Sequence, residues 1–340
     1  MATIGIASAQ GMSTAMQNKS QRDPLLVAIV GPTASGKTAL SLAVAEKFSG
    51  EIVSCDSVAV YRELEIGSAK PTAAERARVP HHLLDIASPL DSYTAGDFSR
   101  DARNAINEIG DRKRMPIIAG GTGLYLRSLI DGLFSGPQRN DALRDELRAA
   151  AEAKGPESLH ARLVVLDPAS AEKIHPNDTP KIIRALEVCL AIDKPMSEAW
   201  LQGRNPLTGF RILRIGLDPP REQLKERINE RAAAMFANGL VEETRGLVAR
   251  YGENCRALTT LGYAQCVSLL RGDITEKEAI VSAQLGHRQY AKRQRTWFRR
   301  EPDVRWLYNF GSEPDMVASA LRMVETALLP DQKTGLMRYR

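Results

Sequence analysis

The fold is decided by residues 25–38, which read Leu-Leu-Val-Ala-Ile-Val-Gly-Pro-Thr-Ala-Ser-Gly-Lys-Thr. The apolar, partly β-branched run 25–30 is typical of a buried parallel strand. It leads into the pattern Gly-x4-Gly-Lys-Thr at 31–38, and residues 39–45 are good helix formers. A strand, a glycine-rich turn and a helix N-terminus in this order predict a phosphate-binding loop, the P-loop.

The side chains of this loop suit a di- or triphosphate. Gly31 and Gly36 permit backbone conformations that turn successive N–H groups toward one anion. Lys37 adds a full positive charge, and the hydroxyl of Thr38 can hold a hydrated Mg²⁺. A chance match of a glycine-rich turn is the alternative, and the flanking strand and helix argue against it.

The composition of the 340-residue chain is that of an ordinary globular protein, with 43% hydrophobic and 26% charged residues. A net charge of +5 is compatible with a nucleic-acid partner without establishing one. The four cysteines form no Cys-x-x-Cys pair, which argues against a zinc site or a disulfide framework and favours a reducing cytoplasm. No apolar run approaches the roughly 20 residues that span a bilayer, so we expect no membrane partner.

Strand-like and helix-like segments alternate with glycine-rich turns, which predicts an α/β, P-loop NTPase-like fold with a mostly parallel sheet flanked by helices. Further strands are expected at 51–57, 82–86, 115–119 and 211–218. Helices are expected at 91–109 (with Thr94 as cap), 124–130, 221–238, 240–251, 263–271, 275–300 and 314–328.

The middle of the chain has a different character, with short charged helices expected at 141–154, 156–161, 167–174 and 179–192, and only 163–166 able to form a strand. We therefore expect a catalytic core of residues 24–136 and 211–328 with a helical insertion domain at 137–210. Residues 1–23 predict a disordered N-terminal extension rather than a signal peptide, and 329–340 a C-terminal tail.

Asp56 closes the second expected strand, at the sheet edge where ligands of such folds bind. The same edge should carry the P-loop and Thr122, and the neighbouring Cys55 should point to the other face of the sheet. Asp56 could act as a general base or hydrogen-bond acceptor beside a phosphate-bound substrate, or it could be a cap or a solvated strand end. No apolar strand clearly ends in a Mg²⁺-binding Asp, so the bound phosphate need not undergo phosphoryl transfer.

A second informative stretch is 287–300, which reads His-Arg-Gln-Tyr-Ala-Lys-Arg-Gln-Arg-Thr-Trp-Phe-Arg-Arg and holds six Lys or Arg residues but no acidic one. Arg288, Lys292, Arg295 and Arg299 recur at helical spacing and form one stripe. A solvated charged face is the ordinary explanation. The interleaved aromatic residues and the absence of an acid favour a polyanionic backbone as partner.

Seven motifs occur together, and they read Gly31-Pro-Thr-Ala-Ser-Gly-Lys-Thr38, Asp56-Ser57, Gly67-x-Ala-Lys-Pro71, His81-His82-Leu-Leu-Asp85, Gly120-Gly-Thr-Gly-Leu-Tyr125, His175-Pro-Asn-Asp178 with Arg184-Ala-Leu-Glu187, and Ala291-Lys-Arg-Gln-x-Thr-Trp-x-Arg299. With these motifs, residues 24–310 resemble the bacterial tRNA dimethylallyltransferases, also called tRNA isopentenyltransferases. Ala59 stands where many members have Gln, so a side-chain contact to a base would be lost or replaced, whereas Gly262-Tyr-Ala-Gln265 agrees with the family.

The resemblance implies transfer of a dimethylallyl group from dimethylallyl diphosphate to N6 of the adenine 3′-adjacent to the anticodon (position 37) of certain tRNAs. The P-loop would then hold the leaving diphosphate, with Mg²⁺ as cofactor at Thr38. Asp56 would take the proton from the amine, and Thr122 would lie beside the reacting centre as a second catalytic residue. The implied diphosphate ligands are Gly31, Pro32, Thr33, Ala34, Ser35, Gly36, Lys37, Thr38, Arg227 and Arg231.

The implied macromolecular partner is the anticodon stem-loop of tRNA, bound by a monomeric protein. The implied tRNA contacts are Asp56, Ser57, Val58, Ala59, Thr122, Arg144, Pro180, Lys181, Ile182, Ile183, Arg184, Thr259, Thr260, Leu261, Gly262, Tyr263, Ala264, Lys292, Arg293, Gln294, Arg295, Thr296, Trp297, Phe298 and Arg299. The alternatives are an adenylate isopentenyltransferase acting on free adenine nucleotide, a P-loop small-molecule kinase that turns over ATP, and a non-catalytic RNA-binding module.

Overall fold

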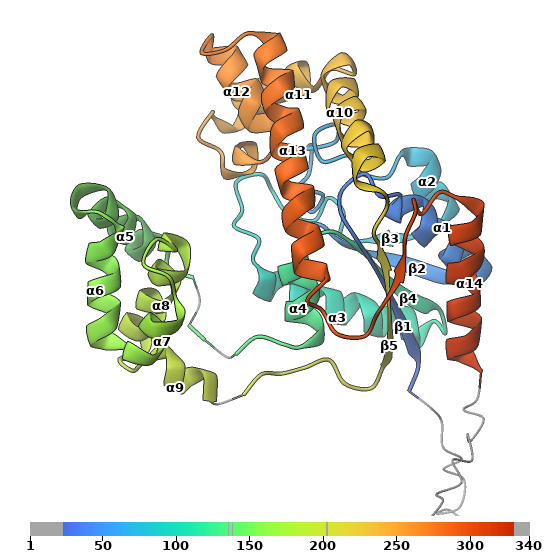
Figure 1. Cartoon of the computed structure of the whole chain (residues 1–340), viewed down its shortest axis with the longest axis horizontal. Coiled ribbons are helices and arrows are strands. Elements are labelled where there is room, and N and C mark those ends of the chain that lie inside the picture. The colour runs from blue at the N-terminus through green and yellow to red at the C-terminus, as the bar shows by residue number, and fades with distance from the viewer. Residues whose placement is uncertain (1–22, 135, 138, 202, 330–340) are drawn as a thin grey trace, which may run out of the picture. The chain divides into compact units, whose positions relative to one another are not determined.

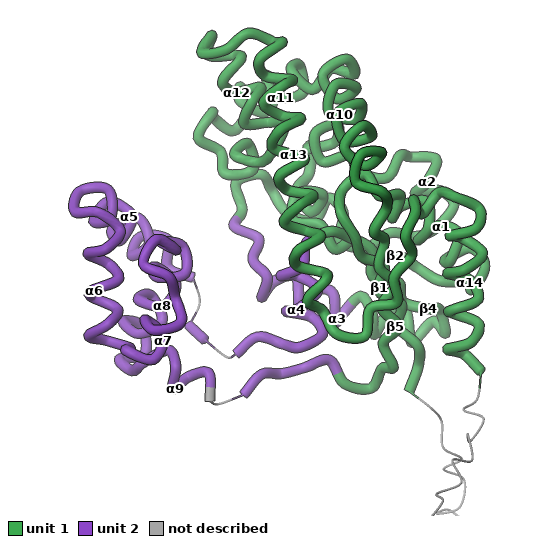
Figure 2. Tube along the Cα trace, viewed as in Figure 1, with its two compact units in different colours: residues 1–91, 105–121, 208–340 green, residues 92–104, 122–207 purple. Residues whose placement is uncertain are grey.

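The computed structural model describes residues 23–329 except 135, 138 and 202. Figure 2 shows two compact units: unit 1 comprises residues 1–91, 105–121 and 208–340, and unit 2 comprises residues 92–104 and 122–207. The expected extension at 1–23 and tail at 329–340 lie outside the described residues, apart from Asp23 and Leu329. The expected domain limits at 137 and 210 stay a prediction.

Unit 1 is built on a six-stranded sheet in the order β3-β2-β4-β1-β5-β6 (Figure 1), and each neighbouring pair of strands is parallel. The strands are β1 (Leu25–Val30), β2 (Gly50–Cys55), β3 (His81–His82), β4 (Met115–Gly120), β5 (Arg211–Leu217) and β6 (Val304–Leu307). The expected P-loop-type parallel sheet is confirmed. The expected strand at 82–86 is wrong beyond His82, because Leu83 and Asp85 have φ of 60° and 57°, which ends the extended backbone.

The register of the sheet aligns the carboxyl ends of its central strands. Val30 of β1 pairs with Gly120 of β4 and with Gly216 of β5, and Cys55 of β2 pairs with the same Gly120. The loops that follow these four strands therefore leave the sheet at one edge, which is where ligands bind in this class of fold.

One face of the sheet is covered by α1 (Lys37–Lys47) and α14 (Pro314–Leu328), which lie side by side in Figure 1. Alternate residues of β1 point to this face, and Val27 and Ile29 join a buried apolar cluster with Val44 of α1 and Val324 of α14. Each large apolar side chain buried in this way contributes about 1.5–3 kcal/mol. This burial fixes the helix that follows the P-loop against the sheet.

The other helices of the core are α2 (Ala73–Arg78), α3 (Ala95–Asp111), α10 (Arg221–Ala237), α11 (Leu240–Tyr251), η1 (Arg256–Thr259), α12 (Tyr263–Arg271) and α13 (Glu276–Phe298). The two short helices α2 and η1 were not predicted, and the other five lie within a few residues of the expected limits. The hydroxyl of Thr94 accepts a hydrogen bond from the N–H of Asp97, which confirms the expected cap of α3. In the part of the chain that the structure describes, every helix is too short or too polar to cross a bilayer.

Unit 2 contains α4 (Gly123–Ile130), α5 (Asp141–Lys154), α6 (Pro156–Leu166), α7 (Pro168–Lys173), α8 (Thr179–Ile192) and α9 (Met196–Leu201). Its apolar core includes Leu159 and Leu163 of α6 and Leu186 of α8. The possible strand at 163–166 is wrong, because this stretch is the last turn of α6. A four-residue apolar run does not by itself distinguish a strand from a helix, and here Leu159 and Leu163 have the helical spacing that buries one face.

Candidate functional site

A cavity of about 910 Å³ lies in unit 1 at the carboxyl edge of the sheet. Its volume is within the range of small-molecule sites. The walls are formed by the P-loop, by the turn after β2, by two segments that approach from other loops, and by α10 and α13. The lining residues include 33–38, 56–59, 67–71, 259–261, Gly121, Arg227, Glu230, Arg231, His287, Tyr290, Arg293 and Gln294.

The P-loop turns into α1 at Gly36, whose φ of 88° is in the left-handed region. A Cβ at this position would lie 2.8 Å from the backbone nitrogen of Gly311, so both the conformation and the space require glycine. Two loop amides already have acceptors in the protein: the N–H of Thr33 donates to Gln294 Oε1 at 2.7 Å, and that of Ser35 to the carbonyl of Pro32 at 3.3 Å. A bound anion would therefore meet the other loop amides and the N-terminus of α1.

Two cationic side chains face this loop. Lys37 Nζ donates to the carbonyl oxygen of Pro32 at 2.6 Å, and burial, reinforced by the charge of Arg231, lowers the pKa of Lys37 to about 7. Arg231 Nη1 lies 3.4 Å from Thr33 Oγ1, and burial also lowers the pKa of this arginine. Within the described residues neither cation forms an ion pair with a carboxylate, although the charge of Asp56, on the same cavity, acts on both and favours their charged forms.

Arg227, one turn before Arg231 on α10, is placed differently. Its guanidinium lies 3.6 Å from the centroid of the Phe310 ring, and its Nη2 is 3.7 Å from Glu313 Oε1. Both arginines line the cavity, but Arg231 is the one in contact with the P-loop. The sequence alone did not distinguish between these two roles.

Asp56 directly follows β2, as expected, and its carboxylate lines the cavity. Oδ1 accepts hydrogen bonds from the N–H groups of Val58 (2.8 Å) and Ala59 (3.2 Å), so the side chain also holds its own turn. Among the described residues Oδ2 receives no hydrogen bond, and this oxygen is available to a ligand. Ala59 is only 4% exposed, and its side chain offers no polar group to the cavity.

The segment 67–71 is held by a buried tyrosine. The Tyr263 side chain is completely buried; its hydroxyl accepts from the N–H of Gly67 (3.1 Å) and donates to Glu243 Oε1 (2.6 Å). Burial and the nearby Glu243 carboxylate raise the pKa of Tyr263. Of the expected contact segment 259–264, the structure places 259–261 on the cavity wall and Tyr263 behind it.

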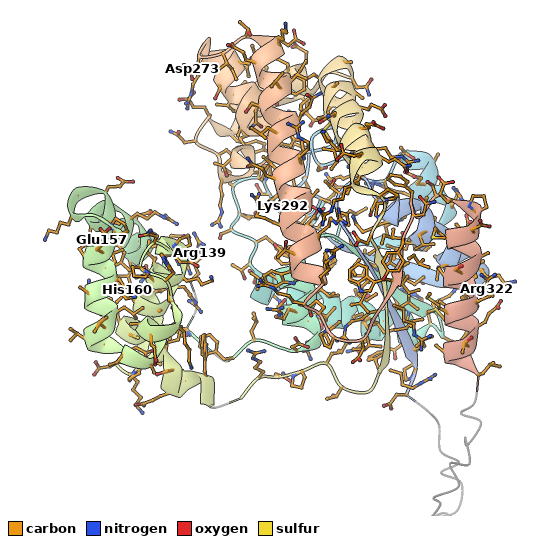
Figure 3. All side chains as sticks on the ribbon, viewed as in Figure 1. Arg139, Glu157, His160, Asp273, Lys292 and Arg322 are labelled. Atoms are coloured by element: carbon orange, nitrogen blue, oxygen red, sulfur yellow. The ribbon has the colours of Figure 1, made fainter. Side chains whose placement is uncertain are left out.

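Helix α13 presents one face to the cavity, through His287, Tyr290 and Gln294. Burial and the charge of Arg231 lower the pKa of His287 to about 4, so this imidazole is neutral near pH 7. Arg293 also lines the cavity. Lys292, labelled in Figure 3, is exposed, whereas Phe298 is buried.

The stripe of cations on α13 is partly compensated by an acid from another element. Arg295 and Arg299 each lie 2.6 Å from an oxygen of the buried Asp218, which follows β5. Arg288 Nη1 donates to Asn229 Oδ1 at 2.6 Å. The stretch 287–300 contains no acid of its own, but the fold brings Asp218, 81 residues from Arg299 in sequence, to Arg295 and Arg299. Their contact with RNA stays a prediction.

Other expected RNA contacts belong to unit 2. Arg144 donates twice to the buried Glu187, at 2.9 and 2.7 Å, and Arg184 donates to Glu187 Oε2 at 2.5 Å. Ile182 and Ile183 are buried in the core of the unit. Thr122 precedes α4 and is not among the described residues that line the cavity, so its catalytic role stays a prediction.

Some cavity residues were missing from the expected site. The motif Gly67-x-Ala-Lys-Pro71 was noticed but received no role, and its position after a turn at the sheet edge could have suggested one. His287 and Tyr290 lie seven and four positions before Gln294, so helical spacing alone would have placed them on the same face.

Comparison with known proteins shows to which family the chain belongs. The family model described as IPP transferase matches residues 59–301. A protein of Koribacter versatilis named tRNA dimethylallyltransferase is 58% identical over 305 residues, which cover 90% of this chain and 99% of that protein.

Two solved structures are similar as well. The tRNA isopentenylpyrophosphate transferase of Bacillus halodurans has a TM-score of 0.66 and 38% identity, covering 89% of this chain and 96% of that one. A eukaryotic dimethylallyltransferase acting on tRNA has a TM-score of 0.76 and 28% identity, covering 91% and 81%. The P-loop, the turn after β2 and the basic helix α13 therefore occur in a chain that belongs to the IPP transferase family.

Proposed function

We propose that this protein is a tRNA dimethylallyltransferase that moves a dimethylallyl group from dimethylallyl diphosphate to N6 of the adenine 3′-adjacent to the anticodon (position 37). The observation that carries the proposal is that Asp56 and the P-loop line one cavity, with Lys37 and Arg231 on its wall. An anion site and a carboxylate that face the same space are what transfer from a diphosphate to an amine requires.

The reaction breaks the C–O bond between the dimethylallyl carbon and the diphosphate and forms a C–N bond to N6. Lys37, Arg231, the unengaged loop amides and the N-terminus of α1 stabilise the negative charge that develops on the departing diphosphate. Asp56 Oδ2 accepts a hydrogen bond from the amine and takes its proton as the bond forms. Oδ1 meanwhile remains bound to the two N–H groups of its turn.

Magnesium fits the oxygen donors at this cavity. The described residues contain no cluster of three or more His, Cys, Asp or Glu side chains that would enclose a metal. Mg²⁺ usually keeps several waters and binds through one or two protein oxygens and the substrate phosphates, and the exposed hydroxyl of Thr38 suits that mode. When bound there, the ion supplies positive charge that offsets the charge of the diphosphate.

The tRNA would present a single-stranded loop base, which costs little to unstack. Exposed cations on α13, Lys292 and Arg293, are suitable partners for phosphates of the anticodon stem-loop. We place the reaction in the cytoplasm, because all four cysteines lie within the described residues, are buried and form no disulfide.

Nucleoside mass spectrometry tests the proposal. Unmodified tRNA is incubated with the protein, Mg²⁺ and dimethylallyl diphosphate, and we expect N6-isopentenyladenosine in the tRNA digest. Parallel reactions contain AMP in place of tRNA, or ATP in place of dimethylallyl diphosphate. Prenylated AMP with unmodified tRNA, or ATP turnover without prenyl transfer, would contradict the proposal.

A further inference from the structure

One buried side chain connects the loops that follow two neighbouring strands. Gln294 is 5% exposed, and its side-chain amide bonds in two directions. Oε1 accepts the N–H of Thr33, in the P-loop after β1, at 2.7 Å, and Nε2 donates to the carbonyl oxygen of Gly121, just after β4, at 2.9 Å. Glutamine supplies both the acceptor and the donor that these backbone groups need.

The next residues of α13 attach the helix to a third loop. Arg295 and Arg299 pair with Asp218, which follows β5. Since β4, β1 and β5 are adjacent in the sheet, α13 bonds to the loops after three neighbouring strands. Of the three side chains that make these bonds, Gln294 is the one that contacts the P-loop.

The space around the Gln294 side-chain amide leaves no room for a side chain at position 121 unless the amide moves. A Cβ on Gly121 would lie 2.1 Å from Gln294 Nε2, so the amide occupies the space that any other residue at 121 would need. Thr33 lines the cavity, and its hydroxyl is 3.4 Å from Arg231 Nη1. A change in the orientation of the Thr33 peptide would therefore move a group that faces the diphosphate site.

We propose that Gln294 is a positioning residue for the prenyl transfer: it fixes the peptide of Thr33 and, through it, the Thr33 hydroxyl and Arg231 at the diphosphate. This inference rests on the function proposed above. It gives Gln294 a role inside the site, whereas the family pattern had suggested a contact with RNA. Gln294 lines the cavity with its amide on the P-loop, so its effect should fall on the small substrate that binds there.

The first test compares steady-state kinetics of wild type and Gln294→Met, which keeps the shape but loses both hydrogen bonds. We expect kcat/KM for dimethylallyl diphosphate to fall about 10- to 100-fold, as displacement of a positioned group does, with KM for tRNA within about twofold of wild type. Gly121→Ala should give the same pattern, because its Cβ displaces the amide. The double variant should be no worse than the poorer single variant.

Asp218→Asn is the matched control, because it weakens the attachment of α13 without touching the P-loop. We expect it to lower Tm while kcat/KM for dimethylallyl diphosphate stays within about twofold. An unchanged kcat/KM in Gln294→Met would overturn the inference, and so would an equal loss in Asp218→Asn. If Gln294→Met does not fold, Gly121→Ala and the same control decide the matter.

Calorimetric binding of inorganic diphosphate separates this inference from the proposed function. We expect Kd to rise about tenfold or more in Gln294→Met and to stay near the wild-type value in Asp218→Asn. If Gln294→Met binds diphosphate more weakly but the wild type prenylates no tRNA, the proposed function is wrong and Gln294 still positions the diphosphate site. Equal binding by the variant and an active wild type would remove the positioning role alone.

Discussion

Lys37 Nζ donates a 2.6 Å hydrogen bond to the carbonyl oxygen of Pro32, within its own P-loop. The Lys37 side chain therefore bends back onto its own loop, although a bound phosphate would need its ammonium group. Burial, with the charge of Arg231, lowers its pKa from 10.5 to about 7. The protonation state of Lys37 should therefore affect both the stability of the folded protein and the affinity of the P-loop for diphosphate.

We expect diphosphate binding to weaken as the pH rises from 7 to 9, because Lys37 loses its proton through a pKa of about 7 while the anion requires the charged form. Isothermal titration calorimetry across this range measures the effect. Lys37→Arg is the control, since arginine stays charged throughout and its loss of affinity with pH should be smaller. An equal loss in both proteins would mean that another group titrates.

The same pKa makes a prediction for stability. The unfolded chain holds the Lys37 proton up to about pH 10.5, whereas the folded chain releases it near pH 7. The free energy of unfolding should therefore rise with pH between these values. Below pH 7 the folded protein carries the buried charge of Lys37, and its full destabilising effect applies. Lys37→Met should raise Tm by about 2–4 °C at pH 6, a gain that disappears toward pH 10 in calorimetric scans.

Asp56→Asn should abolish most prenyl transfer without disturbing the turn. The Asn Oδ1 can still accept the N–H groups of Val58 and Ala59, but the side chain no longer takes a proton. We expect kcat to fall about 10²- to 10⁴-fold, with diphosphate binding and Tm near the wild-type values. Asp56→Ala is a poorer test, because it also removes both bonds of the turn. Retained turnover by Asp56→Asn would exclude a base at this position.

The basic residues of α13 should fall into two groups, those that bind RNA and those that stabilise the fold. Lys292 is exposed, so Lys292→Ala should reduce the slope of log K against log salt for an anticodon stem-loop by about 0.7–0.9. Arg295 pairs with the buried Asp218, so Arg295→Met should instead destabilise the protein by about 2 kcal/mol, as measured by urea unfolding. A reduced salt slope with an unchanged unfolding midpoint in Arg295→Met would show that this arginine also reaches RNA.

The sequence was sufficient for those parts of the fold whose causes are local. The run 25–30 and the pattern after it predicted β1, the P-loop and α1, and α5 and α8 were predicted with the limits 141–154 and 179–192. Caps explain the last two: the side chains of Asn140 and Asp178 accept N–H groups at the starts of these helices. Neither β6 (Val304–Leu307) nor α9 (Met196–Leu201) was predicted, because four and six residues are too short to establish a period.

Only the parts of the site that belong to a sequence motif could be predicted from the sequence. Asp56 and the P-loop were expected at one edge, because carboxyl ends of parallel strands meet there. Other contacts of the site join segments that are far apart in sequence, and no sequence pattern predicts them. They are the ion pair of Asp218 with Arg295 and the hydrogen bonds of Gln294 to Thr33 and Gly121. A charged residue without a local partner can find one across the fold, and a polar residue on a basic helix can face inward.

Tyr263→Phe should show that this tyrosine acts from behind the cavity wall. Loss of the hydroxyl leaves the buried N–H of Gly67 without its acceptor, which costs about 1–3 kcal/mol, while Glu243 Oε1 keeps the hydrogen bond from the N–H of Ile66. We expect a lower Tm and a lower kcat/KM, because segment 67–71 of the cavity wall loses an attachment. Tyr251→Phe, whose hydroxyl meets the partly exposed Glu63, is the control and should have little effect. A tRNA effect without any loss of Tm would instead indicate direct contact with RNA.

Acid should selectively weaken the attachment of Arg144 in unit 2. Burial alone would raise the pKa of Glu187, but hydrogen bonds from Arg144, the N–H of Asn140 and Arg184 outweigh it and lower the pKa to about 2. A carboxyl whose pKa falls from 4.5 to about 2 on folding contributes stability that is complete above pH 4.5 and is lost as the pH falls toward 2. Glu187→Gln should therefore cost about 3 kcal/mol in urea unfolding at pH 7 and much less at pH 3. The exposed Glu152→Gln, on α5, should change neither value. A Glu187→Gln deficit that is equally large at both pH values would mean that packing, rather than the ion pairs, explains why a carboxylate is buried there.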